Sequence, residues 1–214
     1  MTAAAPPRGT TTTDYAAHLD AAHEAAAPNA VVVGPGGYAF ATPERLAADP
    51  LWLSGTTGHA LRPAAVLPVA NRVAAEFGVA CARLADPEPG RVVGARTERL
   101  RHHLLRAHTR LLAHVVDLTV ADLGGRTAAG SPLLGRQLVQ AGIADAVLLV
   151  EETGGLLDAG VDHDAHPAAF ARLVRGGRAL LRLLGAASFL TDGPGGAVLT
   201  AEQVGTLYLA VRHD

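Results

Sequence analysis

A polar turn lies between two long apolar segments at residues 126–137, where the sequence reads RTAAGSPLLGRQ. It combines Arg126, a turn of Gly, Ser and Pro, and the first residues of a helix that carries Gln137. A guanidinium supplies a fixed positive charge with several donors, and the first turn of a helix directs free backbone N–H groups towards an anion. The segment is therefore a candidate site for an anionic cofactor at a junction between helices.

Two further groups of polar side chains could do chemistry, and each also has a structural interpretation. Residues 162–166, DHDAH, could chelate a divalent cation through His163 and His166 with the neighbouring carboxylates. All these ligands are local, however, so the start of a helix is the simpler interpretation. A polar stripe farther upstream could line a substrate cleft, or could face solvent or another subunit. It consists of His103, Arg106, Arg110, His114 and Asp117.

The composition excludes several kinds of chemistry. The 214 residues carry a net charge of −2, which is too small to steer nucleic acid. All 18 Lys+Arg positions are arginine, so a Schiff-base lysine and a P-loop lysine are excluded. The single cysteine, Cys81, excludes an intrachain disulfide and a thiolate zinc site. No ligand set for a metal is assigned.

The chain begins without the basic and then apolar pattern of a signal peptide. No apolar run reaches the roughly 18 residues that a membrane-spanning helix needs. We therefore expect a cytoplasmic protein that binds neither membrane nor nucleic acid.

The N-terminal part of the chain is expected to be irregular. Residues 1–13 are rich in Ala, Pro and Thr and predict a disordered N-terminus. Residues 14–90 predict a short helical and loop region. Within it we expect a helix at 14–27, an extended segment at 31–40, a short helix after Thr42 and then a loop, a helical segment at 63–83, and a linker at 86–90.

Residues 91–214 predict a helical-bundle domain. Residues 96–123 lack Gly and Pro and carry a broad apolar face, which is typical of a bundle helix with several neighbours. Further helices are expected at 133–158 and 167–184, and a fourth at 200–211 with Thr200 as its N-cap. Short connections between four helices favour an up-down four-helix bundle, so the fold class is mainly α.

The spacing of the polar turn and the helix after it carries a family resemblance. The matching positions are Arg126, Gly130, Pro132, Leu133, Gln137, Gln140 and residues 143–145. They resemble the acyl-CoA dehydrogenase pattern R-x-x-F-G-x-P-L-x-x-x-Q-x-x-Q-x-x-L-A-D, without a gap. In that family the segment is the turn between two helices of the C-terminal bundle. The resemblance implies that bundle here, with a shortened N-terminal segment.

The resemblance also implies site residues and a cofactor. In the family the arginine meets the FAD pyrophosphate and the glutamine contacts the nucleotide, both across a subunit interface. These roles fall on Arg126 and Gln137. The structural alternatives are an arginine that caps helix carbonyls and a glutamine on a solvated helix face. The row of Arg172, Arg175, Arg178 and Arg182 could receive the phosphates of CoA or a carrier protein, or could face solvent.

Several positions depart from the family pattern. Ala129 replaces the phenylalanine before the glycine, and Arg182 stands where the family has the glutamine of its Q-x-x-G-G segment. Only about 95 residues precede the bundle, too few for the family's N-terminal helical domain and flavin-shielding β-domain. In the family the catalytic glutamate lies either near the last helix or on the first bundle helix. The first of these positions falls at 209–214, which contains no Glu. Glu98 lies near the second, at the start of a helix, where the helix dipole also favours a glutamate. The catalytic residue is therefore unknown.

Taken with these departures, the resemblance implies a reduced subunit in FAD-dependent α,β-dehydrogenation of an acyl thioester bound to CoA or a carrier protein, in natural-product metabolism. It would work with a larger acyl-CoA dehydrogenase-like subunit or as a homo-oligomer, and would hold FAD only with its partner. The alternative is a non-redox protein on the same bundle without flavin, either a cyclase or dehydratase or a structural partner. The altered positions Ala129 and Arg182 favour this alternative.

Overall fold

Long helices form most of the structure, a computed structural model that describes residues 11–54, 59–85, 95–160, 163–189 and 193–210. The described residues are mainly helical, as the sequence predicts, and they also form small sheets. Residues 1–10 of the predicted disordered segment and the predicted linker at 86–90 lie outside the described residues, whereas residues 11–13 are the first residues of a helix. The long helices within the described ranges are α1 (Thr11–Ala26), α4 (Ala95–Gly124), α5 (Gln137–Ala159), α6 (His166–Leu184) and α7 (Pro194–Tyr208).

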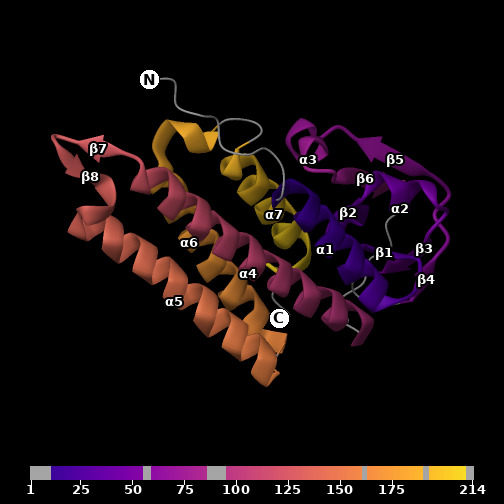
Figure 1. Ribbon diagram of the computed structural model, residues 1–214. Coiled ribbons are helices and arrows are strands. Elements are labelled where there is room, and N and C mark those ends of the chain that lie inside the picture. Colours follow the sequence, from indigo (N-terminus) through magenta and orange to yellow (C-terminus); the bar gives the residue numbers. More distant parts are fainter. Residues whose placement is uncertain (1–10, 55–58, 86–94, 161–162, 190–192, 211–214) are drawn as a thin grey trace.

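Helix α4 is the central helix and packs against α1, α5, α6 and α7 (Figure 1). Its extent confirms the helix predicted at 96–123. Leu104 and Val115 are fully buried on its apolar face. The helix predicted at 14–27 is confirmed as α1, which lies along α4 and joins the four C-terminal helices. In the part of the chain that the structure describes, every helix is too short or too polar to cross a membrane.

Two helices begin elsewhere than predicted. Residues 133–135 form a 3-10 turn, η2 (Leu133–Gly135), so α5 begins only at Gln137. Thr200 does not cap α7, which starts six residues earlier with Pro194 in its first turn, where the missing proline N–H costs no hydrogen bond. The Thr200 hydroxyl instead donates to the Gly196 carbonyl oxygen inside the helix, at 3.0 Å.

Six short strands lie between α1 and α4 among the residues that the structure describes. They form two three-stranded sheets, ordered β1-β3-β4 and β2-β6-β5. Strands β1 and β3 are parallel, and the other pairs are antiparallel. The strands are β1 (Ala30–Val33), β2 (Tyr38–Ala41), β3 (Leu51–Ser54), β4 (Ala60–Leu61), β5 (Val66–Val69) and β6 (Ala80–Leu84).

The prediction of a helical segment at 63–83 is wrong. These residues form β5, the short helix α3 (Arg72–Glu76) and β6. Pro68 does not kink a helix but lies in β5, an edge strand, where a missing N–H is tolerated. The extended segment at 31–40 and the helix after Thr42 are confirmed. The latter is α2 (Pro43–Ala47), and the Thr42 hydroxyl accepts a hydrogen bond from the Arg45 backbone N–H, at 3.3 Å.

Strands β1, β2 and β6 bury side chains on both faces, because successive side chains point to opposite sides, whereas the edge strand β5 is largely exposed. On one face, Val32 and Phe40 join the main core with α1, α4 and α7. On the other face, the two sheets pack on each other around a second core, which consists of Val31, Val33, Ala39, Ala41, Trp52, Ala82 and Leu84. Figure 1 shows that the strands lie at one end of the helical layer.

Candidate functional site

The segment that contains Arg126 folds as a β-hairpin followed by η2 and α5. Strands β7 (Thr127–Ala128) and β8 (Ser131–Pro132) flank a two-residue turn. Ala129 and Gly130 both have positive φ, 53° and 78°, as the tight hairpin turns with matching twist require. The hairpin projects from the end of the helices that is opposite the six-stranded part (Figure 1).

Arg126 joins the C-terminal ends of two helices. Its Nη1 donates to Asp122 Oδ2 at 2.9 Å, near the end of α4, and to the Leu184 carbonyl oxygen at 3.2 Å, the last residue of α6. This is a capping contact, although to α6 rather than to the preceding helix. The side chain remains 47% exposed, so these bonds leave it accessible from outside the chain.

Gln137 is the first residue of α5, and its side chain is exposed. The N-terminus of α5 has no acidic residue in its first turn and no side-chain cap. Next to it, Arg136 reaches back across the hairpin, and its Nη2 donates to the Ala128 carbonyl oxygen at 3.0 Å. The predicted site residues thus lie at one end of the helical layer, beside a helix N-terminus that can accept an anion.

The structure brings together two candidates that are far apart in the sequence, Glu98 and His166. The Glu98 carboxylate lies 3.7 Å from His166 Nδ1 and 3.5 Å from Arg101 Nη1. Arg101 also donates from Nε to the Tyr208 carbonyl oxygen, at 2.9 Å. Burial lowers the pKa of Arg101, and the Glu98 charge opposes this shift. The cluster therefore links α4, α6 and α7 inside the protein.

Replacing Glu98 by glutamine should lower the free energy of unfolding by about 1–2 kcal/mol, because the buried Arg101 loses its charged partner. Urea unfolding followed by circular dichroism measures this difference. Glu44→Gln is the matched control, since Glu44 is exposed and should change stability little. Equal stability of Glu98→Gln and the native chain would contradict a structural role for the cluster.

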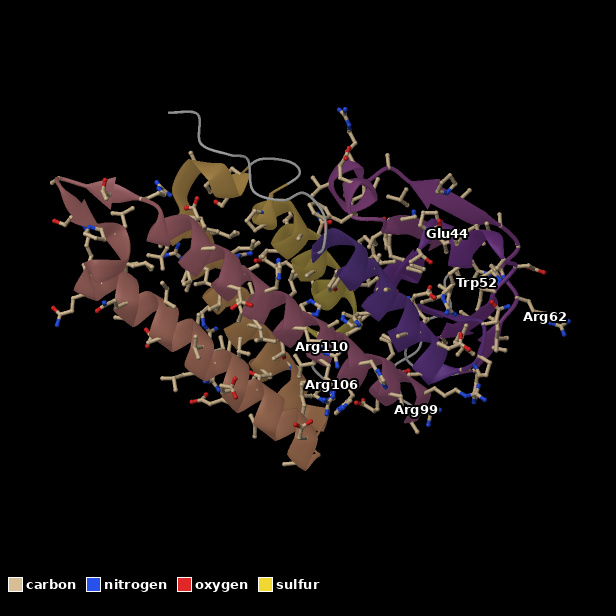
Figure 2. All side chains as sticks on the ribbon, in the orientation of Figure 1. Glu44, Trp52, Arg62, Arg99, Arg106 and Arg110 are labelled. Carbon is tan, nitrogen blue, oxygen red and sulfur yellow. The ribbon has the colours of Figure 1, made fainter. Side chains whose placement is uncertain are left out.

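Four of the other polar candidates, His166, Arg106, Arg172 and Arg178, contact residues within the chain, whereas Arg110, Asp117, Arg175 and Arg182 are exposed. His166 points inward rather than into a metal site, and no three potential metal ligands come together among the described residues. Arg106 donates to Asp158 and to His102 Nε2. Figure 2 shows Arg106 next to Arg110 along α4. In the α6 row, Arg172 pairs with Glu152 and Arg178 pairs with Glu202.

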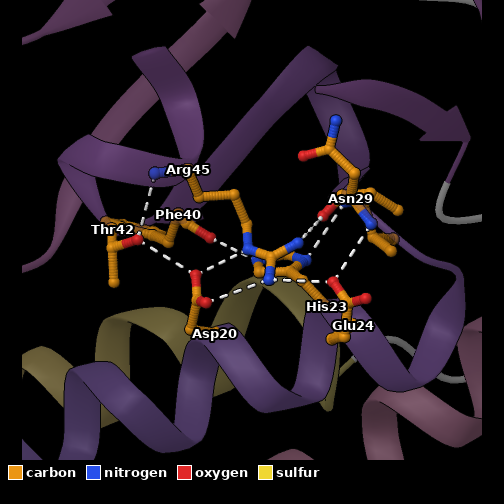
Figure 3. A network of polar contacts seen from close by, with 9 residues as sticks. Asp20, His23, Glu24, Asn29, Phe40, Thr42 and Arg45 are labelled. Atoms are coloured by element: carbon orange, nitrogen blue, oxygen red, sulfur yellow. Dashed lines mark hydrogen bonds and ion pairs between the residues drawn. The ribbon is translucent and has the colours of Figure 1, made fainter. Parts of the chain in front are cut away.

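Sequence reasoning missed a polar network between α1 and the strands (Figure 3). Arg45, with only 9% of its side chain exposed, donates to Asp20 from Nε and Nη2, at 2.5 and 2.9 Å. It also reaches Glu24 and the Ala30 carbonyl oxygen. The Arg45 guanidinium lowers the pKa of Asp20. Each group has a partner within the chain, so we interpret this network as structural.

His23 and Tyr208 were also missed, and they connect β1 to β2. Val32 donates from its backbone N–H to His23 Nδ1 at 3.1 Å, and its carbonyl accepts from the Tyr208 hydroxyl at 2.9 Å. Phe40 donates from its N–H to the Tyr208 oxygen at 3.0 Å, and its carbonyl lies 2.7 Å from His23 Nε2. Two side chains thus satisfy four buried backbone groups at the junction of the two sheets.

An apolar cavity of about 20 Å³ lies between α4, α6 and α7. His108 lines it together with Leu111, Leu173, Val198 and Glu202. Both ring nitrogens of His108 lie 2.7 Å from backbone carbonyls, and burial lowers the pKa of the ring. This volume holds about one water molecule, so the cavity is too small for a substrate.

Comparison with known proteins finds solved structures with a similar fold but no match in sequence. No protein-family model matches the chain, and no curated protein matches it in sequence. The steroid ACAD Tcur3481-Tcur3483, in its G363A variant, matches with a TM-score of 0.51 and 17% identity, over 86% of this chain and 60% of that chain. Butyryl-CoA dehydrogenase from Megasphaera elsdenii matches with a TM-score of 0.54 and 11% identity, over 85% and 59%.

These matches confirm the predicted resemblance to acyl-CoA dehydrogenases at the level of the fold. The chain spans about 60% of the length of these solved structures. Residues 96–212 are little more than half of the chain, so a match over 86% also includes residues before the helical part. The similarity therefore extends into the region that contains the strands.

Proposed function

We propose that this chain is a subunit of an acyl-CoA dehydrogenase-like flavoprotein that takes part in α,β-dehydrogenation of an acyl thioester, bound to CoA or a carrier protein. The observation that supports this most directly is the exposure of Arg126 and Gln137 at the projecting hairpin. A cofactor that binds there is accessible to a second chain. The partner is a larger acyl-CoA dehydrogenase-like subunit or another copy of this chain.

In this proposal residues 91–214 are the helical-bundle domain and residues 14–90 are a short N-terminal region of helices and loops. The fold similarity to acyl-CoA dehydrogenases, which extends over both parts, supports this division. The second core around Trp52 lies in the N-terminal region, between its two sheets. Natural-product metabolism remains the proposed setting, on the resemblance alone.

The residues at the hairpin fit a flavin nucleotide. Arg126 would bind the pyrophosphate, the uncapped N-terminus of α5 would add backbone N–H donors, and Gln137 would contact the nucleotide. When bound, FAD would accept the hydride from the β-carbon while a base takes the α-proton. We do not assign that base to Glu98, because Arg101 and His166 hold its carboxylate inside the protein.

A second candidate is a non-redox protein on the same fold, either a cyclase or dehydratase or a structural partner without flavin. Ala129 favours it, because the turn lacks the aromatic side chain that this position has in the family. Purifying the chain with and without the product of a neighbouring gene separates the two candidates. A colourless preparation in both cases supports the second, whereas yellow colour only with the partner supports the first.

Replacing Arg126 by alanine should weaken flavin binding by about 1–3 kcal/mol, the scale of a lost charge-assisted contact. Flavin fluorescence during titration of the apo complex of both subunits measures the affinity. Arg62→Ala is the matched control, because Arg62 is exposed among the strands (Figure 2). If the Arg126→Ala complex bound flavin as tightly as the control, Arg126 would only cap α6.

A further inference from the structure

Helix α4 carries a row of basic side chains on its outer side. Four residues follow one another at spacings of three and four, which place them on one side of the helix. These residues, which we call the α4 ridge, are Arg99, His103, Arg106 and Arg110. The side chain of Arg106 is 37% exposed, and the other three residues are exposed. Figure 2 shows the three arginines along α4.

Acidic residues balance little of the charge of the α4 ridge. Residues 99–116 contain no Asp or Glu. Among the residues that the structure describes, Asp158 pairs with Arg106, and no carboxylate pairs with Arg110. Burial lowers the pKa of His103, and the charges of Arg106 and Arg110 lower it further. The ridge therefore has a positive field that an anionic partner can neutralise.

Helix α1 leaves its side of the ridge uncovered. Arg99 donates from Nε to the Ala25 carbonyl oxygen, at 2.8 Å, and this contact fixes where α1 meets the ridge. Residues 21–27 contain five alanines, whose side chains are too short to cover an arginine. The acidic residue among them, Glu24, accepts a hydrogen bond from Arg45 in α2 instead.

Helix α5 leaves the other side open next to Arg110. The two helices are antiparallel, and the pair of Arg106 with Asp158 fixes their register. One turn farther along each helix, Arg110 is level with Gly154. A Cβ atom added to Gly154 or to Gly155 would meet nothing within 4 Å. The Arg110 guanidinium is thus accessible to a partner from outside the chain.

The length of the α4 ridge favours a protein partner over a single phosphate group. From Arg99 to Arg110 the helix rises roughly 16 Å. One phosphate group can contact only neighbouring members of such a row. Carboxylates that recur every three or four residues on a partner helix can contact the whole row, because they repeat at the same spacing.

We propose that the α4 ridge docks an acidic helical face of the carrier protein that delivers the acyl thioester. This inference rests on the proposed function, and it favours a carrier protein over CoA as the form of the substrate. Exposed charges of opposite sign speed the association of two proteins and fix their relative orientation. The ridge lies on the part of α4 that is remote from the hairpin, so the carrier protein and FAD would not compete for one surface.

Isothermal titration calorimetry of the full chain with a holo acyl carrier protein, an acidic helical protein, tests the proposal. Arg110→Glu should weaken binding about tenfold or more, because carboxylates of the carrier protein then meet a like charge. Arg175→Glu is the matched control, since Arg175 is an exposed arginine on α6 and should leave binding unchanged. Asp158→Asn should strengthen binding about twofold or more, because it removes the carboxylate that pairs with Arg106.

Circular dichroism verifies that each variant is folded. Absence of binding by the native chain, or equal effects of Arg110→Glu and Arg175→Glu, would overturn the proposal. So would binding of CoA alone with the same dependence on Arg110, since the ridge would then be a phosphate site. Carrier binding by a chain that stays colourless with its partner contradicts the flavin function alone. A yellow complex that does not bind the carrier protein contradicts this inference alone.

Discussion

Replacing Tyr208 by phenylalanine should lower the free energy of unfolding by about 2–4 kcal/mol. The change removes one oxygen atom, but that oxygen accepts from the Phe40 N–H and its hydroxyl donates to the Val32 carbonyl. Both backbone groups are buried, and leaving a buried donor or acceptor without a partner costs about 1–3 kcal/mol each. Urea unfolding of the native and variant chains measures the loss.

Tyr38→Phe is the matched control for this prediction. Tyr38 lies in β2 next to the same junction, but its side chain is 37% exposed. Water can replace a hydrogen bond of its hydroxyl, so the control should change stability by less than about 0.5 kcal/mol. If Tyr208→Phe were as stable as Tyr38→Phe, then water or backbone rearrangement would satisfy Val32 and Phe40 without the tyrosine.

The long helices could be predicted because their evidence is local. Residues 96–123 repeat apolar positions at helical spacing and lack Gly and Pro, and α4 has nearly these bounds. The start of α7 could not be predicted as easily. A threonine before an apolar stretch resembles an N-cap, but the Pro194 turn begins the helix earlier, and Thr200 then bonds within it.

The strands were harder to predict because their stability comes from distant partners. Residues 66–69 and 80–84 are too short for periodicity to distinguish strand from helix. What decides is pairing: β6 lies between β5 and β2, and its Cys81 and Leu84 are buried against different cores. None of these contacts is visible in a window of neighbouring residues.

The candidate site was predicted in part. Spacing identified Arg126 and Gln137, and the structure places both at the hairpin end, although their roles stay proposals. Spacing alone does not reveal that Arg126 also caps α6 through the Leu184 carbonyl. Nor does it reveal that Glu98 meets His166, because these residues lie 68 positions apart in the sequence and only the packing of α6 on α4 brings them together.

Lowering the pH should destabilise the protein through His23 before the carboxylates of the protein are protonated. Burial lowers the pKa of His23 from 6.5 to about 4, and the nearby Arg45 charge adds to this, against the hydrogen bond to Phe40 and the charge of Asp20. The neutral ring suits its site, because Nε2–H can donate to the Phe40 carbonyl while Nδ1 accepts from the Val32 N–H. A proton on Nδ1 would remove that acceptor.

The direction in which stability changes with pH follows from proton binding. Between pH 6.5 and 4 the unfolded chain binds a proton at His23 that the folded chain does not, so stability falls as the pH falls through this range. The contribution is fully present above about pH 6.5, and about 2 kcal/mol of it should be lost by pH 5. Urea unfolding at pH 7.5, 6 and 5 measures the slope.

The His23→Gln variant isolates this contribution from that of the other histidines. An amide can still accept and donate hydrogen bonds but does not titrate in this range, so its stability should fall about 2 kcal/mol less than that of the native chain between pH 7.5 and 5. His108, whose pKa burial also lowers, contributes equally to both proteins and cancels in the difference. Parallel stability curves for the two proteins would show that His23 is protonated in the folded state as readily as in the unfolded state.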